Sequence, residues 1–204
     1  MNRSSKSKSI LNVWMSLCFL LVLSACTYGF QDIKVTGIPA DVFEPGTQEF
    51  DIDILFETAL QEVRKVLSGA YFQGMIFSGR CQDLPRLRGK LIFVFAQVRP
   101  AIPRQQVIRA TVVIDTVRQV MEIDYGNVSA FYPSTKHRAF IGGQAIEEIA
   151  VASYQNVIKL GRCEGDITLT QFDDFWSVRC GSLNDFSQKC QFKIEYAEIG
   201  DSAK

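Results

Sequence analysis

The only histidine in the chain is His137, so any acid–base or nucleophilic chemistry that needs an imidazole must use this residue. It lies within residues 132–138, Tyr-Pro-Ser-Thr-Lys-His-Arg, a composition typical of a polar, solvated loop. The Asp173–Asp174 pair is a candidate for acid–base work, but adjacent strand residues point to opposite faces, which favours a turn. The Gly142–Gly143 pair could present N–H groups to an anion, yet a simple helix entrance explains it better. With no nucleophile elbow, phosphate loop or dinucleotide fingerprint, we predict no catalytic residue, no metal and no cofactor.

Charged residues are unevenly distributed along the chain, which is the best sequence hint of a binding surface. Between Arg80 and Arg109 the only acid is Asp83, whereas residues 41–62 carry seven acids and no basic residue. An arginine guanidinium is a planar fork suited to phosphate or carboxylate. The candidate anion-binding residues are Arg80, Arg86, Arg88, Lys90, Arg99, Arg104 and Arg109. The alternative is that they lie at strand ends and pair locally with the acidic segment.

A proline-stiffened turn is a second candidate for contact with a partner. Pro100 and Pro103 cannot continue a strand ladder because proline lacks the N–H donor. Ile102 lies between them and could form an exposed apolar tip. A plain connection between two strands accounts for the same residues.

The N-terminus has the pattern of a targeting signal. Arg3, Lys6 and Lys8 precede an apolar stretch from Ile10 to Val22, which is too short for a stable membrane span. The stretch ends in Leu23-Ser24-Ala25-Cys26. This segment resembles the bacterial lipoprotein signal peptide with its lipobox.

That resemblance implies cleavage before Cys26, which would become the lipidated first residue of the mature chain. An ordinary cleaved secretory signal or a short N-terminal anchor is the alternative. The residue after the cysteine is Thr27 and not Asp, and by the sorting rule of the class this points to the outer membrane, facing the periplasm. More than one acyl chain gives durable anchoring, at roughly 0.8 kcal/mol per buried CH2.

Four cysteines remain once Cys18 is removed with the signal and Cys26 is lipidated. An even number in an oxidising compartment indicates two disulfides. Of the three pairings possible for Cys81, Cys163, Cys180 and Cys190, we favour Cys180–Cys190 across a hairpin and Cys81–Cys163. A zinc site is the rival, but there is no Cys-x-x-Cys, and His137 is far from all four cysteines in sequence.

Composition indicates one folded domain. Removing residues 1–25 from the 204 leaves 179, enough for a sizeable core, and 47% hydrophobic residues with 15 Phe argue against disorder. Three of the 22 basic residues are lost with the signal, so 19 basic and 22 acidic residues remain and the formal net charge becomes −3. This balance gives no indication of nucleic acid as a partner.

Hydrophobic periodicity predicts two amphipathic helices, at residues 51–67 and 144–160. The predicted strands are 70–78, 90–98, 107–115, 117–125, 166–170, 175–180 and 191–196, with a further short strand near 33–35. Residues 91–96 form a nearly unbroken apolar run that suits a strand covered on both faces. Residues 171–174 are expected to form a hairpin turn.

Strands cluster between helices, which predicts an α+β fold with an antiparallel sheet, two amphipathic helices on one face and a C-terminal disulfide-bearing hairpin region. We expect a signal peptide at 1–25, a tether at 26–39, one domain at 40–199 and a frayed end at 200–204. From about Ile33 to Leu160 the element order is similar to periplasmic lipoproteins that assist lipopolysaccharide transport. No residue motif supports this likeness, and the cysteine-bearing tail departs from it, so no site is carried over.

The expected function is that of a non-enzymatic, membrane-anchored accessory or scaffold in envelope assembly, bound to an envelope protein. The alternative is a module that binds an anionic lipid or glycan, such as lipopolysaccharide, through the Arg80–Arg109 residues. The third hypothesis is an envelope hydrolase, which would need His137 or a carboxylate pair in a cleft.

Overall fold

The computed structural model describes residues 50–99, 106–126, 137–181 and 190–195. All of them belong to one compact unit, Asp32–Lys204; the other unit is Met1–Gln31. Several predicted features lie outside the described residues: Cys26 with its lipobox, the tether, the short strand near Ile33, the Pro100–Pro103 loop with Arg104, and the C-terminal end.

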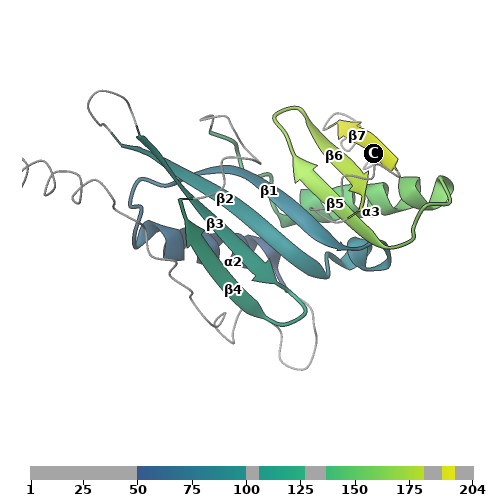
Figure 1. The fold of residues 1–204 in the computed structure, drawn as a ribbon, viewed down its shortest axis with the longest axis horizontal. Coiled ribbons are helices and arrows are strands. Elements are labelled where there is room, and N and C mark those ends of the chain that lie inside the picture. Colours follow the sequence, from purple (N-terminus) through teal and green to yellow (C-terminus); the bar gives the residue numbers. More distant parts are fainter. Residues whose placement is uncertain (1–49, 100–105, 127–136, 182–189, 196–204) are drawn as a thin grey trace, which may run out of the picture. The chain divides into compact units, whose positions relative to one another are not determined.

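The described strands form one antiparallel sheet of seven strands in the order β4-β3-β2-β1-β5-β6-β7 (Figure 1). Their bounds are β1 Tyr71–Arg80, β2 Gly89–Arg99, β3 Gln106–Asp115, β4 Val120–Tyr125, β5 Asp166–Gln171, β6 Phe175–Cys180 and β7 Cys190–Glu195. The helices are α2 (Ile52–Arg64), α3 (Gly143–Lys159) and the short 3-10 helix η1 (Cys81–Arg86). The predicted α+β class and antiparallel sheet are therefore confirmed.

Both α-helices cover the same face of the sheet (Figure 1). One apolar row crosses all seven strands on that face in register: Met121, Ile114, Leu91, Phe77, Leu169, Val178 and Phe192. The α2 stripe expected from the sequence is buried against it through Leu55, Phe56, Ala59 and Leu60. Phe56 lies at the centre of a group of aromatic rings that includes Phe72, Phe93 and Phe140.

The opposite face of the central strands is also apolar. Ile76 and Val94 are fully buried, Ile92 is nearly so, and Val113 packs against them. As the apolar run predicted, every residue from Leu91 to Ala96 is buried.

The N-termini of the two α-helices meet. Asp51 caps α2, and its side chain accepts hydrogen bonds from the backbone N–H groups of Asp53 and Ile54. Gly142 at the N-cap of α3 has no side chain to do the same, so the carboxylate of Asp53 accepts from the N–H of Gly143 instead, at 2.9 Å. Each helix N-terminus therefore has an aspartate oxygen on its otherwise unpaired N–H groups.

Several element bounds differ from the prediction, and three of these differences are informative. The first helix ends at Arg64, because Val66 N–H bonds to the carbonyl of Val63 in a tighter turn. β4 begins at Val120, because the Asp115 carboxylate accepts from the N–H groups of Val117 and Arg118 and forms a turn there. Leu160, predicted to lie on the buried side of the second helix, follows its last residue and is 56% exposed. The short helix η1 was not predicted.

Candidate binding site

The candidate site forms beside the part of β1 that is not paired with β5. β1 pairs with β5 only from Ile76 to Arg80, and the segment 137–141 lies beside the first half of β1 instead (Figure 1). The N–H of Arg138 donates to the carbonyl of Phe72 at 3.0 Å. A β-bulge at Gln73 interrupts the β1–β2 register at the same place. The segment therefore fills the opening between β1 and the β5–β6 turn.

Arg138 connects the two sides of this opening. Its Nε donates to Oδ1 of Asp173 at 2.5 Å, and its Nη1 donates to the backbone carbonyl of Gln73. The Arg138 side chain is only 10% exposed, compared with 39% for Asp173. Because a guanidinium stays charged in proteins, such burial requires partners of this kind. The pair therefore fixes the β5–β6 turn to the bulge of β1.

A pocket with a volume of about 420 Å³ opens beside this ion pair. This size is within the range of small-ligand sites. One side is lined by His137, Arg138, Ala139 and Ile141, and the other by Gln171, Phe172 and Asp173. The amide nitrogen of Gln171 donates to the carbonyl of Ala139 at 3.5 Å, so the two sides are hydrogen-bonded to each other.

Aromatic rings support both sides of the pocket. His137 stacks on Tyr71 with ring centroids 3.6 Å apart, and Phe172 stacks on Phe175 with centroids 4.8 Å apart. Burial raises the pKa of Tyr71 above its ordinary value of 10.0, an effect that the charge of Arg109 opposes. The phenol is therefore protonated at neutral pH and is a neutral support for the imidazole.

The side chains that line the pocket are of types that bind a ligand through hydrogen bonds and apolar contact. The described residues that line the pocket include no serine, threonine, cysteine or lysine, the usual nucleophiles, and Asp173 already accepts from Arg138. No group of three or more histidine, cysteine or acidic side chains with metal-binding geometry occurs in the described part of the chain. The site offers hydrogen-bond donors, acceptors and apolar ring surface.

Only part of this site was predicted. His137 was expected to be a solvated loop residue and Asp173–Asp174 a turn, and both descriptions fit the structure. Arg138, Gln171 and Phe172 were not predicted as site residues. No spacing in the sequence indicates that residues 137–141 and 171–173 meet, because their contact depends on where the β1–β5 pairing stops.

The described members of the predicted basic set do not form one group. Arg80, Arg86, Arg88 and Lys90 lie near the β1–β2 connection, and Arg99 lies at the far end of β2. Lys90 and Arg99 are nine positions apart along β2, which corresponds to about 30 Å. Arg109 lies in β3, where its Nε donates to Oε1 of the buried Gln73.

Several of these basic residues have acidic neighbours on adjacent strands. Asp166 lies opposite Arg80 on β5, and Asp115 lies opposite Lys90 on β3. Asp115 also contacts Arg118, with 3.7 Å between Nε and Oδ2. Among the ion pairs of the described residues, none joins the basic set to the acidic helix α2. The acidic residues opposite Arg80 and Lys90 in register therefore lie on neighbouring strands and not on the helix.

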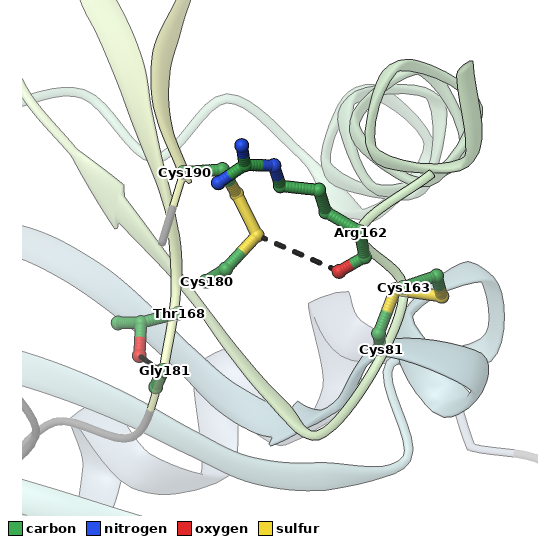
Figure 2. The surroundings of a disulfide bond; sticks show 7 residues. All are labelled: Cys81, Arg162, Cys163, Thr168, Cys180, Gly181 and Cys190. Atoms are coloured by element: carbon green, nitrogen blue, oxygen red, sulfur yellow. Dashed lines mark hydrogen bonds between the residues drawn. A yellow bond between two sulfur atoms is a disulfide. The ribbon is translucent and has the colours of Figure 1, made fainter. Parts of the chain in front are cut away.

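The four remaining cysteines form two disulfides with the pairing favoured from the sequence (Figure 2). Cys81–Cys163 joins the start of η1 to the chain just after α3, and Cys180–Cys190 joins β6 to β7 at residues that are opposite in register. The sulfur of Cys180 lies 3.9 Å from the carbonyl oxygen of Arg162, next to Cys163 (Figure 2). The two bonds therefore fasten neighbouring parts of the fold.

Comparison with protein-family models, curated proteins and solved structures finds no match for this chain. No helix in the described residues combines the length and apolar character needed to cross a bilayer.

Proposed function

We propose that this protein is a lipid-anchored lipoprotein of the bacterial outer membrane and works as a non-enzymatic accessory or scaffold in an envelope assembly. The N-terminal support is the lipobox that ends in Cys26, followed by Thr27. The observation that carries the proposal is the pair of disulfides in the domain that follows. Disulfides persist in oxidising compartments such as the periplasm, which is the compartment that the lipobox implies.

A binding role fits the described domain better than catalysis does. The only histidine stacks on Tyr71 at the edge of a pocket whose lining residues include no serine, threonine, cysteine or lysine. The Asp173 carboxylate is held by Arg138, whose side chain is mostly buried, and this arrangement is structural. Arg138 and Asp173 hold the turn in place and leave a shaped surface for a partner.

Anchoring is tested by replacing the proposed lipidation residue. Cys26→Ser should abolish incorporation of labelled palmitate and leave the signal uncleaved, which a larger mass of the protein on a gel would show. Cys18→Ser is the matched control, because it changes a cysteine within the predicted signal and should leave both readouts unchanged. Labelling of the Cys26→Ser protein at the normal level would contradict a lipid on this residue.

The scaffold role is tested with the lipidated wild-type protein in crosslinked native membranes. Affinity purification followed by mass spectrometry should recover a defined envelope protein in constant ratio. Gentle solubilisation that yields only free monomer, with no crosslinked partner, would contradict the role.

A second candidate function is binding of an anionic lipid or glycan, favoured by the basic residues gathered at the β1–β2 connection. Arg86 is exposed there, and Arg88 follows two residues later. If this end binds anionic vesicles, Arg86→Ser with Arg88→Ser should weaken binding in low salt, where electrostatic attraction is least screened. Arg99→Ser, at the far end of β2, is the control. Equal effects of both changes would refute a localised site.

A further inference from the structure

We propose that the pocket beside the Arg138–Asp173 pair binds the neutral pyranose ring of a saccharide. The inference adds a ligand class to the protein and rests on the geometry of the pocket, not on the lipid anchor. Three features of the described residues support it: the charge balance of the lining, the kind of hydrogen-bonding groups it holds, and its aromatic support.

The charge balance argues against an ionic ligand. Arg138 contributes one positive charge to the lining and Asp173 one negative charge, and the two are in contact at 2.5 Å. An anion would have to compete with Asp173 for a guanidinium that is only 10% exposed, and a cation would have to compete with Arg138. Separating the pair is costly because it leaves the guanidinium of Arg138, which is only 10% exposed, with poor solvation. A neutral ligand avoids that cost.

The hydrogen-bonding groups suit hydroxyls. A carboxylate only accepts, a guanidinium only donates, and an amide or imidazole does both. Asp173, Arg138, Gln171 and His137 supply all of these types around one pocket. Each hydroxyl of a pyranose both donates and accepts, so a ring with several hydroxyls matches a mixed set of this kind better than a purely donating or accepting ligand does.

The apolar part of the lining suits the other surface of a sugar ring. Phe172 lines the pocket and is braced by Phe175, whose ring carries the Lys193 ammonium 4.2 Å from its centroid. The stack with Tyr71 supports the imidazole of His137 on the opposite side. The C–H face of a pyranose is apolar and packs on aromatic rings, whose faces carry partial negative charge. Rings that are already stacked lose little side-chain freedom on binding.

The experiment uses the full lipidated protein in a detergent without a sugar headgroup, because glycoside detergents would compete. The probes are an N-acetylglucosamine disaccharide and maltose, which separate an amino-sugar polymer from a neutral hexose as the source of the ring. His137 is the only histidine and lines the pocket, so its imidazole NMR signals report on the site without sequential assignment. Saturable shifts with one of the disaccharides are the expected result.

Two matched pairs of variants locate the binding. Phe172→Leu should weaken it at least tenfold, whereas Phe175→Leu, outside the pocket lining, should change it much less. Asp173→Ala should abolish it, whereas its neighbour Asp174→Ala should not. Because Asp173 also holds Arg138, the phenylalanine pair keeps the test decisive if Asp173→Ala fails to fold.

The salt dependence of binding distinguishes a neutral sugar from an anion as the ligand. Raising the ionic strength from about 0.1 M to about 1 M shortens the Debye length from about 10 Å to about 3 Å, and should leave sugar affinity unchanged. The proposal is overturned if neither disaccharide shifts the His137 signals, if the Phe172 and Phe175 variants behave alike, or if inorganic phosphate binds there with salt sensitivity. Each of those results leaves lipidation of Cys26 untouched, so failure here is distinct from failure of the anchor.

Discussion

The carboxylate of Asp53 in α2 accepts a hydrogen bond of 2.9 Å from the N–H of Gly143, the first residue of α3. This contact joins residues 90 positions apart and supplies α3 with the cap that Gly142 lacks. Gly143 is closely fitted, because an added Cβ would lie 3.0 Å from Oδ2 of Asp53 and 3.2 Å from Cβ of Ile52. One side chain therefore determines how closely the two helices approach.

Replacing Asp53 tests this capping role. Asp53→Ala should lower the free energy of unfolding by about 1–2 kcal/mol, the usual cost of a lost cap and its interaction with the helix dipole. Asp53→Asn should cost less because an acceptor oxygen remains. Denaturant unfolding measures both. Glu57→Ala, an exposed change on the same helix, should stay within about 0.5 kcal/mol of wild type. A Glu57 effect as large as that of Asp53 would refute the role.

Glu147, in the N-terminal part of α3, should make stability depend on pH. Burial raises its pKa above the ordinary value of 4.5, and the charges of Asp51 and Asp53 raise it further. The folded protein therefore holds this proton more tightly than the unfolded chain, and stability falls as the pH rises through and above 4.5. Glu147→Gln should raise the midpoint of denaturant unfolding at pH 7 and should not raise it below pH 4.5. In the Asp53→Asn protein, NMR titration should show a lower pKa for Glu147.

The two disulfides should contribute unequally, because they close loops of different length. Cys81–Cys163 spans 82 residues and Cys180–Cys190 spans 10. Loop-closure entropy gives about 4.5 kcal/mol for the first and about 2.7 kcal/mol for the second. Paired Cys→Ser variants compared by denaturant unfolding should show this order. If removing Cys180–Cys190 lowered the free energy of unfolding more than removing Cys81–Cys163 does, loop-closure entropy would not explain the contributions of the two bonds.

Phe56 should be among the most costly core residues to truncate. Its ring is stacked parallel to that of Phe140, with the ring centroids 3.8 Å apart. It packs edge to face with the rings of Phe72 and Phe93, at centroid distances of 5.2 and 5.6 Å. Phe56→Ala should lower the free energy of unfolding by about 3–5 kcal/mol. Ile54→Ala is the control, because Ile54 lies on the same helix and is 47% exposed. Similar losses for both would mean that the aromatic group contributes little beyond helix propensity.

Local patterns were enough to predict most elements of the fold. The α2 stripe from Ile52 to Val63 and the alternation of Met121, Ile123 and Tyr125 follow directly from periods of 3.6 and 2 residues, and all of these side chains are buried. The disulfide pairing could also be predicted. Cys180 and Cys190 flank one hairpin, so Cys81 and Cys163 form the other pair.

Features that depend on long-range pairing could not be predicted in this way. Nothing local identifies β5 as the neighbour of β1, or sets the end of their pairing at Ile76. The pocket exists because that pairing stops and Arg138 enters the space, so its residues carry no shared sequence signal. The η1 turn was missed because Pro85 and the left-handed Leu87 make a short, non-periodic element.

The position of β1 in the sheet has a consequence for how the chain is made. Its first neighbour, β2, follows after a short connection, but its second, β5, arrives only after β2, β3, β4 and α3 have been synthesised. A ribosome or a translocation channel delivers the chain N-terminus first, so one edge of β1 stays open throughout that interval. The open edge offers unpaired backbone groups beside Ile76 and Phe77 to any passing strand. The nascent sheet is therefore protected from mispairing at this edge only after β5 has emerged and paired with β1.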